Sequence, residues 1–128
     1  MSQPIVFISH HRIKEGKLDG FKQYFPEGAN LIEASKPGTV VTLAYLNEAG
    51  TEASVIHVFP DAEAMEQHMQ GVGERANAAY EFLEPRGYEI YGRPSDQSLA
   101  VMKQFAASGI PLNVNPQPLG GYLRLKSG

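Results

Sequence analysis

The side chains best suited to exchange a proton near neutral pH are the four histidines, because the imidazole pKa lies near 6.5. His10 and His11 are neighbours in an apolar, β-branched segment. Successive residues of a strand point to opposite faces, so these two rings cannot share a metal ion or a substrate. One of them could line a pocket. In the alternative interpretation His11 is hydrogen-bonded between sheet and helix, and His10 contacts a second subunit.

His57 and His68 lie in different kinds of segment. His57 lies among apolar residues typical of a strand, where a buried ring needs a hydrogen-bond partner. That partner could be Ser9 or a histidine of the first strand. His68 flanks the apolar stripe of a predicted helix, where it could contact a ligand or anchor a loop. We therefore take His11, His57 and His68 as candidate acid/base residues, with a structural role as the alternative for each.

Six tyrosines are many for a chain of 128 residues. Buried tyrosines usually fill a core and hydrogen-bond through the hydroxyl group. The alternative is that one or two of them hold a phenolic or enolate ligand, with Arg12 or His11 stabilising the developing negative charge. The residues that we expect to bind a ligand are Ser9, Arg12, Tyr45, Phe59 and Tyr80.

Several kinds of chemistry lack the residues that they need. No cysteine occurs, which excludes disulfides, thiolate metal sites and a cysteine nucleophile. Histidines at metal-binding spacings and a Gly-x-Ser-x-Gly motif are absent, so we expect no metal site, no bound cofactor and no serine hydrolase. The net charge of −3 and the scattered Lys and Arg residues argue against a nucleic-acid partner. Without a long apolar run or a leader-like start, we expect a cytoplasmic protein with no membrane segment.

The elements that must position these residues follow from the hydrophobic pattern. The pattern predicts a β-α-β-β-α-β order, the ferredoxin-like type of α+β fold, in a domain over residues 1–94. The strands are expected over 4–13, 39–47, 53–59 and 88–91, and the helices over 17–35 and 61–84. Pro26 should kink or split the first helix, and Gly71 and Gly73 should weaken the second. A turn is expected over 85–87.

Residues 95–128 are expected to form a C-terminal extension packed on the same domain. A helix is predicted around 99–106, a fifth strand over 110–114 and a short extended tail over 122–125, with a loop before the tail. The extension could cover the pocket, extend the sheet or reach across a dimer.

Three segments in the right order give a family resemblance. They are Arg12-Ile-Lys-Glu-Gly-Lys17, Glu33-Ala-Ser-Lys-Pro-Gly38 and Phe59-Pro-Asp-Ala-Glu-Ala-Met-Glu-Gln-His68. Together they resemble the antibiotic biosynthesis monooxygenase-like members of the dimeric α+β barrel superfamily. The resemblance implies a homodimer in which two sheets pack face to face, with a small apolar or aromatic ligand between each sheet and its own helices. A covered second face would explain why the strand at 4–13 is apolar on both sides.

The resemblance does not extend to the catalytic residues of known members. The chain has no tryptophan, Ser9 replaces the asparagine of haem-degrading members, and His68 replaces their helix tryptophan. Haem degradation is therefore not expected. The expected function is a cofactor-independent oxidoreductase of the monooxygenase type, acting on a small aromatic or polyketide-like molecule. The alternative is a non-catalytic, ligand-binding or stress-related homodimer.

Overall fold

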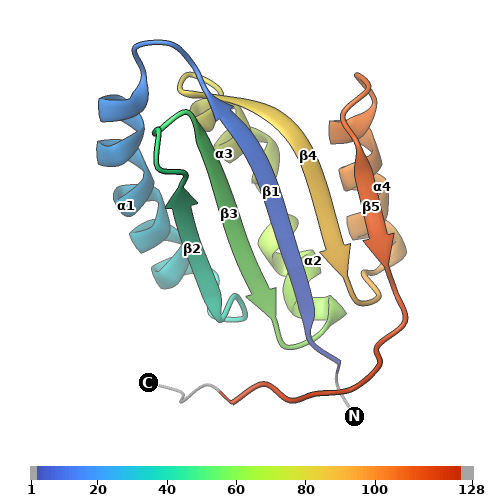
Figure 1. Cartoon of the computed structure of the whole chain (residues 1–128). Coiled ribbons are helices and arrows are strands. Elements are labelled where there is room, and N and C mark those ends of the chain that lie inside the picture. Colours follow the sequence, from blue (N-terminus) through green and yellow to red (C-terminus); the bar gives the residue numbers. More distant parts are fainter. Residues whose placement is uncertain (1–2, 125–128) are drawn as a thin grey trace.

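Five strands form one mixed sheet, and four helices lie on one of its faces, within residues 3–124 that the computed structural model describes (Figure 1). The strands are β1 (Ile5–Ile13), β2 (Val41–Leu46), β3 (Glu52–Phe59), β4 (Leu83–Tyr91) and β5 (Leu112–Asn115). The helices are α1 (Leu18–Ser35), α2 (Ala62–Met69), α3 (Val72–Ala79) and α4 (Asp96–Ala106).

The sheet has the order β2-β3-β1-β4-β5, in which β5 is parallel to β4 and the other pairs are antiparallel. This arrangement confirms the predicted ferredoxin-like α+β fold class. β5 extends the sheet beyond β4, and α4 contacts α2 (Figure 1). Residues 122–124 form no strand, and Leu125, the last residue of the expected tail, lies outside the described residues. No helix in residues 3–124 combines the length and the apolar character needed to cross a membrane.

The two expected helix interruptions have different outcomes. α1 continues through Pro26 as one helix, so the expectation of a split is wrong. Phe21 is buried and packs against Phe25, with ring centroids 5.9 Å apart, so tertiary packing outweighs the hydrogen bond that the proline removes. The second helix does break: Gly71, at φ +78°, separates α2 from α3 in a left-handed conformation that favours glycine.

The expected turn over 85–87 is also wrong, because these residues lie inside β4. The register between β1 and β4 shifts there: His10 pairs with Gly87 and His11 with Pro85. Arg86 is therefore the additional residue of a β-bulge. A bulge admits a proline within a strand because it already interrupts the regular hydrogen bonding.

The two faces of the sheet differ in what covers them. The odd-numbered residues of β1, such as Ile5 and Phe7, are buried beneath the helices. The even-numbered residues, such as Val6 and Ile8, lie on the open face, which no helix of the described chain covers (Figure 1). We call this second side the open face. The open face carries several large side chains that are exposed to solvent. Tyr45 of β2, for example, is 60% exposed.

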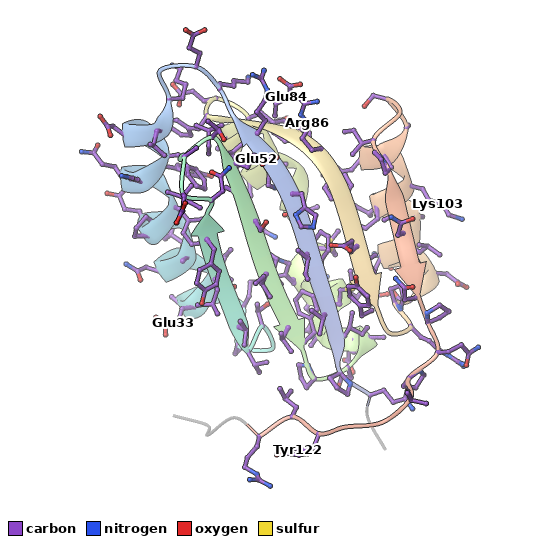
Figure 2. All side chains as sticks on the ribbon, in the orientation of Figure 1. Glu33, Glu52, Glu84, Arg86, Lys103 and Tyr122 are labelled. Atoms are coloured by element: carbon purple, nitrogen blue, oxygen red, sulfur yellow. The ribbon has the colours of Figure 1, made fainter. Side chains whose placement is uncertain are left out.

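Charged residues gather at one end of the open face. Glu84 accepts a hydrogen bond from Arg12 at 2.7 Å and lies 3.7 Å from Arg86. Figure 2 shows Glu84 and Arg86 near Glu52, at the end of the sheet where β3 and β4 begin.

A second polar group lies farther along this face, where the His10 ring is 3.1 Å from the Ser54 hydroxyl and 2.6 Å from a Glu89 carboxylate oxygen. The open face is therefore partly polar, and its exposed apolar residues lie mainly on β2.

Candidate functional site

A cavity of about 460 Å³ lies between the helix-covered face of the sheet and the surrounding helices. Its volume falls in the range of roughly 300–1,000 Å³ that is usual for small-molecule sites. Most of its wall is apolar and aromatic. The aromatic residues that line it are Phe7, Phe21, Tyr24, Phe25, Tyr80, Tyr88 and Phe105. Such a wall suits a flat, largely apolar molecule.

His57 and His68 form a pair of rings in this wall. Their ring centroids lie 4.5 Å apart. His57 comes from β3, where its Nδ1 lies 3.1 Å from the hydroxyl of its cross-strand neighbour Thr42. His68 lies in the last turn of α2, and its Nδ1 is 2.8 Å from the hydroxyl of Thr39. Both Nδ1 atoms thus have a threonine hydroxyl as partner, while the Nε2 atoms have no side-chain hydrogen-bond partner within residues 3–124.

Burial keeps both rings neutral at pH 7. It lowers the pKa of His57 to about 4, and nearby Arg75 lowers it further, while a hydrogen bond to the backbone of Val41 acts in the opposite direction. Burial lowers the pKa of His68 to about 3, with further contributions from His57, Arg75 and Lys36. A neutral imidazole can accept a proton through the nitrogen that carries no hydrogen.

Arg75 brings a positive charge to the cavity wall. Its Nη1 donates to the carbonyl of Gln70 at 3.0 Å, and its Nη2 donates to the carbonyl of His68. These carbonyls lie at the C-terminal end of α2, where a cation is favoured. The side chain is half-buried, and burial lowers the pKa of Arg75. No carboxylate within residues 3–124 forms an ion pair with it.

Ser9 and His11 form a second polar pair, two residues apart on β1. The Nε2 of His11 lies 2.9 Å from the Ser9 hydroxyl. Its Nδ1 is buried and has no hydrogen-bond partner in the described part of the chain. Burial, followed by repulsion from His10, lowers the pKa of His11 to about 4. His11 is therefore a third neutral ring at pH 7.

Five of the expected site residues line the cavity, namely Ser9, His11, His57, His68 and Tyr80. The sequence suggested Ser9 or a histidine of β1 as the side-chain partner of His57. The partner in the structure is Thr42 instead. Tyr80 lies beside Tyr88, whose pKa is raised by burial and then by the hydrogen bond to Tyr80.

The other three expected ligand-binding residues do not line the cavity. Arg12 is an even-numbered residue of β1, so it points to the open face and pairs with Glu84. Tyr45 also lies on the open face, because its neighbour in β3 is Ser54. Phe59 is on the helix-covered face but fully buried in the core, where its ring stacks on His57. The structure thus corrects the expected placement of these three side chains.

The residues that sequence reasoning missed are Arg75 and the threonines that hold the two rings, Thr39 and Thr42. Each depends on a contact between elements far apart in the sequence. The one sequence feature that could have pointed to Arg75 is Gly71, which indicates a break in the helix. In the structure Gly71 precedes α3 in a left-handed conformation, and Arg75 of α3 contacts the end of α2.

No protein-family model matches the chain, and no curated protein matches its sequence. Solved structures do match. MupZ from Pseudomonas fluorescens has a TM-score of 0.69 at 20% identity, over 98% of this chain and 100% of MupZ.

Two further structures have names that refer to oxygenases. SnoaB from Streptomyces nogalater, a cofactor-independent oxygenase, has a TM-score of 0.60 at 16% identity, over 73% of this chain and 96% of SnoaB. A protein from Bacteroides thetaiotaomicron, named as an antibiotic biosynthesis monooxygenase, has a TM-score of 0.61 at 14% identity, over 97% of each chain. The fold is shared. At these identities the likeness concerns the fold alone, which agrees with the resemblance found in the sequence.

Proposed function

We propose that this chain is a cofactor-independent oxidoreductase of the monooxygenase type, which acts on a small aromatic or polyketide-like molecule. The observation that carries this proposal is the apolar cavity whose wall holds the neutral rings of His57 and His68. The shared fold with SnoaB, a cofactor-independent oxygenase, supports the reaction type. The proposed site comprises the lining residues His57, His68, His11, Ser9 and Tyr80.

Removal of a proton from the substrate is the step suited to the histidines. When Nδ1–H donates to a threonine hydroxyl, Nε2 of His57 or His68 has a free lone pair and accepts a proton from an acidic CH group. The carbanion then bonds to molecular oxygen, the co-substrate, and the proton returns to give a hydroperoxide. Loss of water leaves a carbonyl group. One methylene group and one O₂ molecule thus give one carbonyl group and one water molecule.

We also propose that two copies pair through their open faces and that this dimer is cytoplasmic. Leu43 and Tyr45 of β2 are 46% and 60% exposed there, and the half-buried Val6 and Ile8 of β1 lie on the same face. Exposed apolar residues on a sheet face, left in water, would favour aggregation, and a second sheet packed against them removes that surface from solvent. The pairing places both cavities on the outer sides of the dimer, each served by its own helices.

The test is oxygen uptake by the purified protein with anthrone, which has an acidic methylene group between two aromatic rings. We expect uptake with conversion to anthraquinone, and a loss of at least a hundredfold in His57→Phe and His68→Phe combined. His10→Gln removes a histidine from the open face instead and should retain uptake. Unchanged turnover in the double variant would exclude these rings as the base.

A non-catalytic, ligand-binding role is the second candidate. It is favoured by the threonine partners of His57 and His68, since such hydrogen bonds also serve purely structural histidines. One form of this alternative would have side chains filling the space between sheet and helices. The structure instead has a cavity there that is large enough for a ligand. Binding of an aromatic molecule without any oxygen uptake or product would support this second role.

A further inference from the structure

We propose that the ligand of the cavity carries an anionic oxygen, and that Arg75 binds this oxygen beside the Nε2 atoms of His57 and His68. The proposal rests on the proposed function only in taking the cavity as the binding site, and it names the class of ligand. The shared chemistry is an aromatic or polyketide-like skeleton bearing a phenolate, an enolate or a carboxylate.

The charges of the cavity wall give the first argument. Arg75 is the one Lys or Arg side chain among the lining residues of the described chain. The carboxylates that line the cavity, Glu27 and Glu74, are exposed and form no ion pair with it. With neutral histidines, the interior has an excess positive charge and no anion to balance it. Even a half-buried charge such as that of Arg75 is costly to remove from water unless it is paired, so an anionic ligand would supply the missing partner.

The position of the guanidinium gives the second argument. The carbonyls of Gln70 and His68 hold it in place, so it needs no rearrangement to receive a ligand. These bonds use one N–H of Nη1 and one of Nη2, and the other N–H groups have no acceptor in residues 3–124. Guanidinium N–H groups bind carboxylate and phenolate oxygens in charge-assisted hydrogen bonds, which are stronger than neutral ones.

The arrangement of the neighbouring rings gives the third argument. The backbone carbonyl of His68 accepts from Arg75, so the ring and the guanidinium belong to one connected group. His57 lies 4.5 Å from His68, ring centre to ring centre. In the tautomer with hydrogen on Nε2, either ring can donate to the same ligand oxygen. The anion site is thus built from a fixed cation and two neighbouring rings, of which one can donate through Nε2 while the other keeps a free Nε2 lone pair.

A purely structural interpretation of Arg75 is that it closes the C-terminal end of α2. That role requires hydrogen bonds to the carbonyls of His68 and Gln70, and it makes no distinction between charged and neutral ligands. Selectivity for anions therefore separates the two interpretations.

The experiment compares two matched pairs of probes by titration. 2-Naphthoate is paired with neutral 2-naphthamide, and 4-nitrophenolate with neutral 4-nitroanisole, at a pH at which the acids are ionised. We expect the wild-type chain to bind each anion at least tenfold more tightly than its neutral counterpart. Retention of the visible phenolate band on binding shows that nitrophenol binds as its anion. The two pairs tell carboxylate from phenolate as the preferred group.

Arg75→Gln should abolish this preference while changing the affinity for the neutral probes less than twofold. Arg75→Lys keeps the charge and should retain part of the preference. Lys103→Gln is the matched control, because it removes an exposed charge of α4 that is not among the lining residues of the cavity (Figure 2). Thermal unfolding of each variant shows whether it folds. The comparison of anionic with neutral probes in the wild-type chain does not depend on any variant.

The outcomes separate this inference from the proposed function. Equal affinity for anions and neutral molecules in the wild-type chain overturns the anion site but leaves the cavity as a binding site. Unchanged selectivity in folded Arg75→Gln overturns the role of Arg75, and binding of none of the four probes overturns the inference and the aromatic site together. Selective anion binding without oxygen uptake from anthrone supports the inference and counts against the oxygenase.

Discussion

Acidification should unfold this protein steeply, because three buried histidines must gain protons when the chain unfolds. His11, His57 and His68 have pKa values of about 4, 4 and 3 in the folded chain, mainly because they are buried. In the unfolded chain each ring returns to an ordinary pKa near 6.5. The unfolded state therefore binds more protons than the folded state below pH 6.5. Stability is complete above pH 6.5 and is lost as the pH falls towards the folded-state values.

The magnitude follows from the number of protons bound. At pH 5.5 each unfolded ring is about nine-tenths protonated, and each folded ring is almost entirely neutral. Three rings then give a slope of about 4 kcal/mol per pH unit in the free energy of unfolding. Summed from pH 7 to pH 4.5, the loss is about 7 kcal/mol. A domain is typically stable by only about 5–15 kcal/mol, so the chain should be close to unfolding at pH 4.5.

Urea unfolding followed by circular dichroism at pH 7.5, 6.5, 5.5 and 4.5 measures this slope. Protein concentration must be kept constant, since the proposed dimerisation would also contribute to stability. His68→Gln should reduce the slope by about one third, because one titrating ring is gone. Phe105 lines the same cavity as His68 but does not titrate. Phe105→Leu should therefore lower the free energy of unfolding without altering its slope against pH. A wild-type slope below about 1 kcal/mol per unit between pH 6.5 and 5 would refute the reasoning, since the rings would then be charged in the folded chain.

Three further substitutions test the fold and its pairing. Leu43→Glu places a charge on the exposed apolar part of the open face and should convert dimers to monomers in light scattering; a persistent dimer would contradict pairing through this face. Asp61→Ala removes the side chain that accepts from the Ala64 amide at 2.8 Å, and should lower the free energy of unfolding by about 1 kcal/mol in urea. Gly71→Ala forces a Cβ into the left-handed conformation and should cost about 1–2 kcal/mol in the same assay; an unchanged midpoint would show that the break between α2 and α3 tolerates another geometry.

The fold could be predicted because its elements are encoded locally. The strand at Ile5–Ile13 has alternate residues buried, and Gly71 breaks the helix where the glycines predicted weakness. Pro85–Gly87 was misread as a turn because a bulge is defined by pairing with β1, which lies far away in the sequence. The continuity of α1 at Pro26 likewise depends on packing that the local sequence does not reveal.

The site could be predicted only where the face of a strand decides the position of a side chain. Ser9 and His11 share the helix-covered face, whereas Arg12, one residue later, must point away from it. Arg75 could not be found in this way, because its contacts depend on how α3 returns to the end of α2. The division into a domain over 1–94 and an extension over 95–128 stays a prediction, although Met102 and Phe105 of α4 line the cavity.

The low histidine pKa values limit which substrates the cavity can deprotonate. A ring with a pKa of about 4, such as His57, is a weak base and cannot by itself remove a proton from an ordinary CH or phenol group. Stabilisation of the anion by Arg75 would lower the pKa of the substrate group and so reduce the gap between the pKa values of the substrate and of the ring. A substrate that is itself acidic would reduce the same gap. The anion would also raise the pKa of both His57 and His68, because a nearby negative charge favours the protonated ring. Burial, with a smaller contribution from Arg75, keeps both rings neutral when no ligand is bound. The rings would thus accept a proton only from a substrate that becomes an anion beside Arg75.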